Sequence, residues 1–267
     1  MRDNDNRFWP GCCGLEAWES RWVSRQQVAH WHDAFQVSVT VGGGGAVETP
    51  CGTLLLPEGT GVVLPPGVVH RLRPVGGEGW HFRTIFFPRE SAGHGPTHES
   101  PPVRLSRVAS HQVFDRLFGQ IAAEADRAGQ LDALGRLTAV TLSDDHPVAA
   151  GSESKHPAWL SAVREYLDRT PDRNLKLADL AERAGVGECH LVRTFGREFG
   201  MSPYAYHVQS RVNHARSLLR DGRAPAEVAA DLGFADQSHL TRHFRRLVGT
   251  PPGKYSRKSR SFKTDHR

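Results

Sequence analysis

The chain has few of the residues and patterns that mark several classes of protein. Its 4 cysteines form no Cys-x-x-Cys pair, so neither a disulfide scaffold nor a cysteine-based zinc or redox site is expected. No stretch approaches the ~20 apolar residues that a membrane-spanning helix requires. The first nine residues are too polar for a signal peptide. We therefore predict a cytoplasmic protein with no membrane partner.

Patterns of an enzyme active site are missing as well. The glycine run Gly42–Gly45 is not followed by Gly-Lys-Ser/Thr, so it is not a phosphate-binding loop. The chain has no Gly-x-Ser-x-Gly sequence, and no Ser/His/Asp grouping rises above the background of 15 histidines. We predict that the protein is not an enzyme, with no catalytic residues and no cofactor.

The composition is typical of a globular protein, and the length suits two domains. Of the 267 residues, 38% are hydrophobic and 24% are charged, which excludes a fully disordered chain. Residues 156–267 carry 20 lysines and arginines against 12 acidic residues, whereas residues 1–155 carry 14 against 17. This asymmetry favours a polyanionic partner for the C-terminal half alone, although solubility is a simpler explanation of charge taken by itself.

About the first 90 residues have the pattern of short β-strands. The segment Phe35–Val41 alternates apolar and polar residues, which predicts a strand with one buried face. Further β-type runs at 53–56, 61–64, 68–72 and 80–87 are separated by turn clusters rich in Gly and Pro. Strands at this spacing without intervening helices indicate a β-sandwich or a small barrel.

The periodicity becomes helical between His111 and Leu142. Apolar residues recur there at three- and four-residue steps, and Gly129 is expected to separate two helices. The segment 143–157 is predicted to be a linker between domains because it is rich in Asp, Gly, Ser and Pro. Everything beyond it reads as helix up to a basic tail.

The C-terminal half contains an internal repeat. His190-Leu-Val-Arg-Thr-Phe-Gly-Arg197 aligns with His239-Leu-Thr-Arg-His-Phe-Arg-Arg246 at an offset of 49 residues. The match continues through a Gly, a Pro and a Tyr in each copy. Each copy has the layout of a helix-turn-helix, with a short apolar-striped helix, a glycine at its end and a second helix. A plain helical repeat that packs on itself would explain the apolar positions equally well.

The polar faces of the second helices favour DNA binding over that simpler explanation. With Leu191 and Phe195 buried, the first copy exposes Cys189, Val192, Arg193 and Arg197. With Leu240 and Phe244 buried, the second exposes Ser238, His239, Arg242, Arg245 and Arg246. Arginine binds guanine in the major groove through two hydrogen bonds, and other basic groups neutralise phosphates.

A long helix is predicted between the two copies. Ser202 is expected to cap it, Pro203 suits its first turn, and it is expected to run to about Leu219. A rigid helix would hold the two copies at a fixed separation. Consecutive major grooves on one face of B-DNA lie ~34 Å apart, so one chain could read both.

These motifs resemble the DNA-binding domain of the AraC/XylS family of transcription regulators. The resemblance covers about residues 158 to 256 and rests on Leu180–Gly185, His190–Phe195, Gly200–Pro203, Ala229–Phe234, Asp236–Leu240, Phe244 and Pro251–Tyr255. It implies a sequence-specific regulator that binds double-stranded promoter DNA and that contacts RNA polymerase if it is an activator. The resemblance places base contacts at Cys189, Val192, Arg193, Ser238, His239 and Arg242. Phosphate contacts are expected at Arg197, Gln237, Arg245 and Arg246.

The β-rich half is similar to the cupin-like effector-binding domain that many members of this family carry. The similarity rests on His30-Trp-His-Asp33, on Pro65-Pro-Gly-Val-Val-His70 and on the strand spacing. It implies a small antiparallel β-barrel that binds an unidentified small-molecule effector. The positions expected to line its pocket are His30, His32, Gln36, His70, Trp80 and Arg83, although Arg83 is as readily placed on the outer face.

Two interpretations of the three histidines compete. Together with an amide oxygen they could hold a divalent metal, as in cupin enzymes, which they resemble at His30, His32 and His70. We favour a metal-free pocket, because Gln36 stands where such enzymes have Glu and because regulators of this type usually lack a metal. A metal-dependent cupin enzyme fused to a DNA-binding domain, and an effector-independent regulator, are the alternative functions.

The predicted fold class is multidomain α and β, with an N-terminal cupin-like antiparallel β-barrel and a C-terminal all-α domain. The expected domains are a cupin-like effector-binding domain at 1–105, a helical segment and linker at 106–156, a double helix-turn-helix domain at 157–256 and a basic tail at 257–267. In the family that the chain resembles, helices like those at 106–156 commonly mediate dimerisation. A homodimer is therefore predicted.

Overall fold

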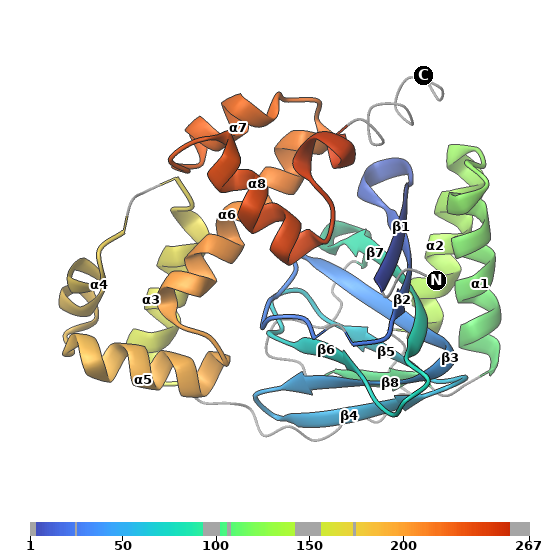
Figure 1. Cartoon of the computed structure of the whole chain (residues 1–267), viewed down its shortest axis with the longest axis horizontal. Helices are drawn as coiled ribbons and strands as arrows, with labels where there is room; N and C mark the ends of the chain where they lie inside the picture. The colour runs from blue at the N-terminus through green and yellow to red at the C-terminus, as the bar shows by residue number, and fades with distance from the viewer. Residues whose placement is uncertain are drawn as a thin grey trace. The chain divides into compact units, whose positions relative to one another are not determined.

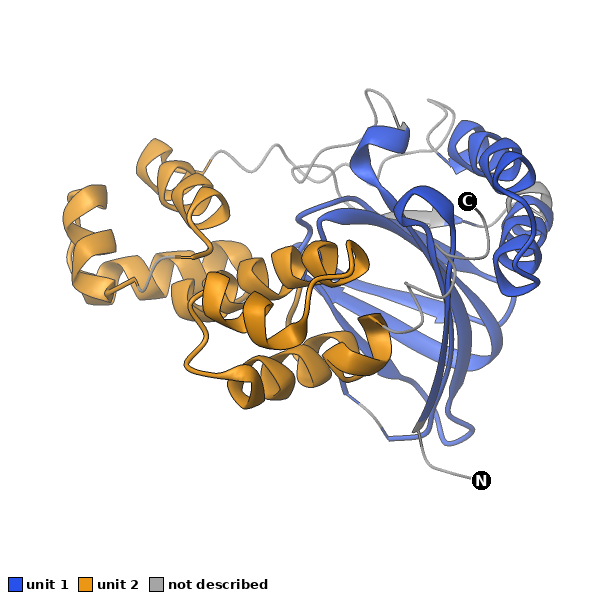
Figure 2. Ribbon diagram, turned by 90° about the horizontal axis from the view of Figure 1, so that it is seen from above, with its two compact units in different colours: residues 1–27, 31–153, 261–267 blue, residues 28–30, 154–260 orange. Residues whose placement is uncertain are grey.

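The computed structural model describes residues 4–24, 26–92, 102–105, 108–141, 156–172 and 175–256. The chain forms two compact units (Figures 1 and 2), one of residues 1–27, 31–153 and 261–267, the other of residues 28–30 and 154–260. Most of the expected linker and the basic tail at 257–267 lie outside the described residues. Within the described part of the chain, no helix is long and apolar enough to cross a membrane.

The first unit contains an eight-stranded sheet followed by two helices. Its strands are antiparallel to their neighbours, and the main path through the sheet runs β1-β2-β7-β3-β5-β8, with β4 and β6 also paired to β3. The strands are β1 (Asn4–Pro10), β2 (Glu16–Trp22), β3 (Ala34–Thr49), β4 (Gly52–Pro57), β5 (Gly61–Leu64), β6 (Arg71–Pro74), β7 (Trp80–Pro88) and β8 (Val103–Leu105). Two 3-10 turns, η1 (Cys12–Gly14) and η2 (Arg89–Ala92), complete the described elements before the helices.

Strand β3 is long because it takes part in two sets of pairings. Its first half pairs with β5 and β7, and its second half pairs with β4 and β6 after an irregularity between Thr40 and Gly42. Glycines permit this bend: Gly43 has a φ of +68°, and a side chain at Gly45 would collide with the Trp80 ring. The described strand pairings leave the sheet open, so the expected antiparallel β-fold is present but the expected closed barrel is not.

Helices α1 (Val108–Ala122) and α2 (Arg127–Thr141) belong to the first unit. Leu117 and Leu137 pack from them onto one sheet face, in a single core with Val37 and Ile85. The expected boundary at residue 105 therefore does not separate two compact bodies.

The prediction that Gly129 separates these helices was wrong. The chain turns at 123–126, and the carboxylate of Asp126 accepts a hydrogen bond from the backbone N–H of Gly129 at 2.9 Å. Asp126 thus caps α2, and Gly129 lies in its first turn.

The second unit is helical, as predicted. Its helices are α3 (Ala158–Arg169), α4 (Leu177–Ala184), α5 (Glu188–Phe199), α6 (Pro203–Arg220), α7 (Pro225–Asp231) and α8 (Gln237–Val248). Helices α4 and α5 form one helix-turn-helix module, and α7 and α8 form the other. Helix α6 lies between the modules in the chain and contacts elements of both.

The ends of these helices are fixed by local signals, of which the glycine after α4 and the cap of α6 were predicted. Gly185 ends α4 in the left-handed conformation with a φ of +66°. The Ser202 hydroxyl accepts a hydrogen bond from the N–H of Ala205 at the start of α6, and Pro203 follows in the first turn. Asp236 caps α8 through the N–H of His239 at 2.6 Å.

Candidate DNA-binding surface and candidate ligand pocket

Helix α5 buries one face and exposes the other. Leu191 and Phe195 are fully buried, and Phe195 packs edge to face against Phe199 and Tyr206. The residues that the sequence assigned to the DNA-facing side are all exposed, namely Cys189, Val192, Arg193 and Arg197. Arg197 forms an ion pair with Glu198 at 2.7 Å, whereas Arg193 forms no ion pair with any described residue.

Helix α8 repeats this arrangement in the second module. Leu240 and Phe244 are fully buried, and Phe244 packs against Tyr255, just as Phe195 packs against Tyr206. The exposed residues of the opposite side include Gln237, Ser238, Arg242, Arg245 and Arg246. Among the residues that the structure describes, none forms an ion pair with Arg242, Arg245 or Arg246. Uncompensated cations on one helix face are a suitable surface for a polyanion.

His239 differs from the other predicted base-reading residues because its ring is held within its own module. Its Nδ1 accepts a hydrogen bond from the N–H of Ala235 at 3.3 Å, and its Nε2 lies 3.0 Å from Nε2 of His243. Burial, together with the positive charges of the neighbouring arginines, lowers the pKa of His243. Contact between His239 and a base therefore requires the ring to leave these partners.

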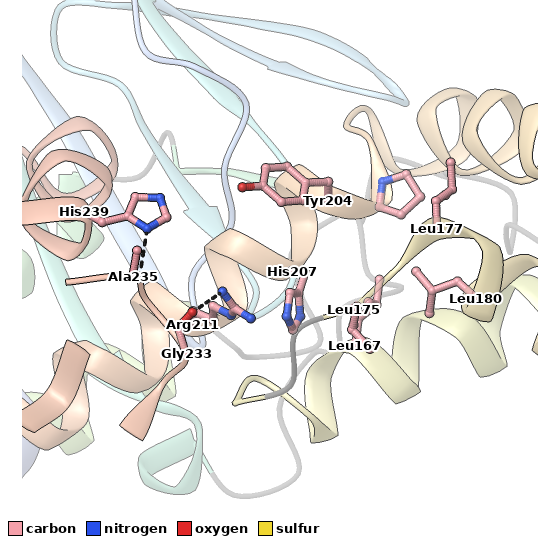
Figure 3. Close-up of a pocket in the computed structure, with 11 residues that line it drawn as sticks. Leu167, Leu175, Leu177, Leu180, Tyr204, His207, Arg211, Gly233, Ala235 and His239 are labelled. Carbon is pink, nitrogen blue, oxygen red and sulfur yellow. Dashed lines mark hydrogen bonds between the residues drawn. The ribbon is translucent and has the colours of Figure 1, made fainter. Parts of the chain in front are cut away.

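A groove of about 360 Å³ lies between the two modules (Figure 3). Its walls are largely apolar, with Leu167 and Leu180 at one end and His239 at the other. Arg211 of α6 crosses it and donates hydrogen bonds to the carbonyl oxygens of Pro171 and Gly233 at 2.8 and 3.0 Å. Helix α6 thereby ties the segment before the first module to the turn of the second.

The sheet of the first unit has a buried polar row, defined here as Gln36, Ser38 and Thr84. The Ser38 hydroxyl lies 2.8 Å from that of Thr84 and accepts a hydrogen bond from the amide of Gln36 at 3.0 Å. All three side chains are at most 3% exposed. The sequence predicted a single buried face for this strand, and this was wrong, because the apolar face packs on α1 and α2 while the polar face points into the unit.

Sequence reasoning missed two further residues of this face. Glu16 and Trp18 of β2 lie opposite Phe86 and Thr84 of β7, which in turn lie opposite Gln36 and Ser38 of β3. Glu16 is buried and its carboxylate accepts a hydrogen bond from the Trp18 indole at 3.1 Å. The signal that could have found them is the alternation in Glu16–Trp22, where residues 16, 18, 20 and 22 share one face of the strand.

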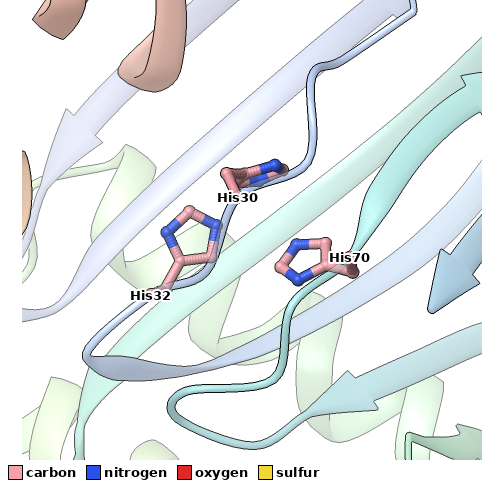
Figure 4. A group of neighbouring side chains, drawn as sticks. All are labelled: His30, His32 and His70. Carbon is pink, nitrogen blue, oxygen red and sulfur yellow. The ribbon is translucent and has the colours of Figure 1, made fainter. Parts of the chain in front are cut away.

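The three histidines singled out in the sequence are brought together (Figure 4). One nitrogen from each of His30, His32 and His70 lies within 4.8 Å of the others, and all three residues are buried. We call them the histidine cluster. Burial lowers the pKa of His70 to about 4, which keeps its imidazole neutral at neutral pH.

The other two expected pocket residues lie on different faces of the sheet. Trp80 shares the inward face of β7 with Thr84, where it is buried with Trp22 and Phe82, and its indole N–H donates to the Thr40 hydroxyl at 3.1 Å. Arg83 is on the opposite sheet face, where it pairs with Glu19 and, on α1, with Asp115. Strand alternation explains this placement, because residues 83 and 84 point to opposite faces.

Glu19 is held as a carboxylate on that outer face. Burial raises its pKa, but hydrogen bonds from His81 and Arg83 outweigh this effect and hold the pKa below the ordinary value. The Arg83 guanidinium also lies 4.9 Å from the centre of the Phe118 ring of α1. Arg83 therefore connects the sheet to its covering helix and does not line the polar side.

Comparisons with known proteins agree with both halves of this description. Residues 180–258 match the model of a helix-turn-helix domain, and residues 12–140 match that of an AraC-like ligand binding domain. The arabinose operon regulatory protein of Escherichia coli is 26% identical over 233 residues, which cover 82% of this chain and 79% of that protein. The regulator YbfI of Bacillus subtilis is 39% identical over 78 residues, covering 29% of this chain and 28% of that protein.

Solved structures support the same architecture. The crystal structure of ToxT from Vibrio cholerae O395 superposes with a TM-score of 0.54 at 10% identity, covering 97% of this chain and 98% of that one. A ToxT structure with a bound unsaturated fatty acid gives 0.53 at 12% identity, covering 96% and 97%. At this identity the likeness concerns the fold alone.

The fold and its two candidate sites define a two-domain, DNA-binding transcription regulator with an N-terminal ligand-binding domain. The two family matches lie one in each half and together span most of the chain. The chain belongs to the AraC family of transcription regulators.

Proposed function

We propose that α5 and α8 enter the major groove of DNA and that their arginines give the protein its sequence specificity. The observation that carries this proposal is the pair Arg193 and Arg242, which occupy the same position in the two modules. Both are exposed, and neither forms an ion pair with a described residue. Each would bind a guanine through two hydrogen bonds, while Cys189, Val192, Ser238 and His239 contact neighbouring base edges.

The remaining polar residues of the surface are assigned to the phosphate backbone. Arg197 and Arg246 occupy equivalent positions toward the ends of α5 and α8, and Gln237 opens α8. Arg245 adds a further positive charge on the exposed side. Contacts of this kind set affinity and salt dependence but not sequence preference.

The ligand of the N-terminal domain is proposed to bind against the polar row and the histidine cluster. Burying hydroxyl, amide and carboxyl groups costs free energy, and a small molecule that hydrogen-bonds to them offsets that cost. Binding would shift the protein between two arrangements that differ in their affinity for promoter DNA. In this proposal the protein is a regulator without catalytic activity that acts in the cytoplasm. At promoters where it activates transcription, it would contact RNA polymerase.

A homodimer is proposed, with α1 and α2 at its interface. Leu131 of α2 is 39% exposed, although the neighbouring Leu134 and Leu137 are buried against the sheet. Leu131 lies on the outer face of α2, where the partner helix of a dimer would pack.

The test is selection of binding sites from random duplex DNA with the full-length protein, followed by affinity measurements on the selected site. Arg193→Ala and Arg242→Ala should each weaken binding by about 1–3 kcal/mol and relax the preference at one base position. The selected site should contain two half-elements about one helical turn apart. The control is Arg7→Ala, which removes an exposed arginine of β1 that pairs with Asp5.

Two results would contradict the assignment. Wild-type affinity of both arginine variants for the selected site would show that another face reads the bases. An equal loss in Arg7→Ala would show that net charge alone is being measured. Addition of candidate effectors to the full-length protein tests the ligand site, because a ligand at 100 times its Kd raises stability by about 2.7 kcal/mol.

A further inference from the structure

The segment that carries two members of the histidine cluster is fixed to the loop that carries the third. The N–H of Gln27 donates to the carbonyl of Leu72 at 3.0 Å, and the N–H of Gly67 donates to the carbonyl of His32 at 2.9 Å. Residues 27–32 are thus hydrogen-bonded at both ends to residues 67–72. The cluster is therefore held by the backbone and not by a chance approach of flexible side chains.

Two of the imidazoles have the same orientation relative to their own backbone. Nδ1 of His30 lies 2.9 Å from the carbonyl oxygen of Val28, and Nδ1 of His70 lies 2.9 Å from that of Val68. A carbonyl can only accept, so in both rings Nδ1 carries the proton and Nε2 carries the lone pair. Metal-binding histidines typically have this arrangement, in which a backbone carbonyl orients the ring and selects the coordinating nitrogen.

The spacing of the cluster suits a small divalent ion. Ligand nitrogens at about 2.1 Å from a tetrahedral metal lie about 3.4 Å from one another. The nitrogens of His30, His32 and His70 already lie within 4.8 Å, so they need to approach by no more than about 1.4 Å. The rings of His32 and His70 are tilted by 52° with centroids 5.4 Å apart, so they converge without stacking.

A buried oxygen of β3 also lacks a hydrogen-bond partner among the described residues. Gln36 is 2% exposed, and its Oε1 has no hydrogen-bond partner among the described residues, although its Nε2 donates to Ser38. Gln36 pairs across the sheet with Phe86, whose ring lies 4.7 Å from that of His32. The absence of a carboxylate at position 36 favoured a metal-free pocket in the sequence analysis. It does not exclude metal binding, because three histidines and a water molecule suffice for zinc.

We propose that His30, His32 and His70 bind one divalent first-row transition-metal ion, of which zinc is the expected occupant, through three imidazole nitrogens. The remaining coordination position faces an oxygen donor, either the Gln36 amide or a carboxylate or hydroxyl group of the effector. The inference rests on the proposed ligand pocket and gives its chemistry: the effector is a small oxygen-donor ligand recognised by the metal.

The experiment uses the full-length protein, freed of affinity tag and metal, and titrates it with Co²⁺ and Zn²⁺. Co²⁺ binding is followed by its visible absorption, and Zn²⁺ binding by competition with Co²⁺. All variants are made in a His239→Gln/His243→Gln background, since this second pair of close imidazoles could take up metal independently. One equivalent of metal is expected per chain.

Exchange of single ligands locates the ion. His30→Gln, His32→Gln and His70→Gln should each lower the affinity about 100-fold or more, since changes in outer-shell partners already cost about 10- to 100-fold. His81→Gln is the matched control, because His81 lies on the opposite face of the sheet and pairs with Glu19. Unchanged affinity in the three variants, or no metal bound in the background protein, would overturn the proposal.

If a histidine variant does not fold, the site can still be tested on protein whose histidine cluster is intact. Nitrogen NMR of the histidine rings should show Zn²⁺ shifting Nε2 of His30 and His70 while Nδ1 stays protonated. Shifts confined to other histidines would overturn the proposal.

The metal site and the DNA-binding surface can be tested separately. Arg193→Ala should bind metal normally, so loss of DNA binding and loss of metal binding remain separate outcomes. An effector that stabilises the metal-free protein and His70→Gln alike would overturn the metal site while leaving the ligand pocket in place.

Discussion

The two units of the molecule differ in where they place the polar groups that are proposed to bind a partner. In the sheet of the first unit, Gln36, Ser38 and Thr84 are buried and face inward. In the helical unit, Arg193 and Arg242 are exposed and face outward. Buried and exposed placement suit partners of different size. A domain can enclose a small molecule, whereas a DNA duplex can be bound only by residues on the protein surface.

This difference has an energetic consequence. A polar group on an outer helix face stays hydrated, so it costs the fold little, and the apolar face alone determines stability. A polar group inside a sheet domain loses its water and must find partners within the protein or in a ligand. The helical unit is therefore expected to tolerate changes at its functional residues, and the sheet unit is expected to gain or lose stability with its ligand.

The largest effect is expected where the helical unit is buried. Phe195→Ala should lower the free energy of unfolding by about 3–5 kcal/mol, because it empties a packed site. The ring of Phe195 contacts those of Phe199 and Tyr206. Urea unfolding followed by far-UV circular dichroism measures the change. Val192→Ala, three residues earlier and exposed, should change stability by less than about 0.5 kcal/mol; equal losses in the two variants would contradict the division into a buried and an outer face.

A smaller effect is expected at the start of α8. Asp236→Ala should cost about 0.5–2 kcal/mol, because it removes the carboxylate that accepts from the N–H of His239. Helix α5 begins instead at Gly187, which provides no side-chain cap and has open space around its Cβ position. Gly187→Asp should therefore stabilise the first module by roughly a few tenths of a kcal/mol. Thermal melts of both variants provide the comparison, and a loss of stability in Gly187→Asp would refute it.

The helical unit could be predicted almost completely from the sequence. Its boundaries depend on local signals, such as Gly185, Ser202 and Asp236, which act within one turn of the chain. Its outer face follows from the helical period once Leu191 and Phe195 are placed inside. The exception is His239, whose contacts with Ala235 and His243 depend on the turn that precedes α8.

The sheet unit could be predicted only in outline. The strands followed from alternation and turn residues, and the three histidines and Gln36 followed from the resemblance to cupin-like domains. The inward direction of Ser38 did not follow, because a polar residue in an alternating strand is normally exposed. Which face is covered depends on α1 and α2, which come much later in the chain. Glu16 was missed for the same reason, since its place depends on the pairing of β2 with β7.

A small change in stability is also expected inside the sheet unit, at Gln36. Gln36→Leu keeps the size of the side chain, gives up the hydrogen bond to Ser38 and removes an oxygen that accepts no hydrogen bond from the described residues. These two effects oppose each other, so the free energy of unfolding should change by less than about 1 kcal/mol. Its neighbour Val37 is fully buried on the apolar face, and Val37→Ala should cost about 2 kcal/mol. Urea unfolding of the two variants separates the faces of β3. A loss in Gln36→Leu as large as that in Val37→Ala would mean that the inward polar groups support the fold, whereas unchanged stability would mean that they are kept for the ligand.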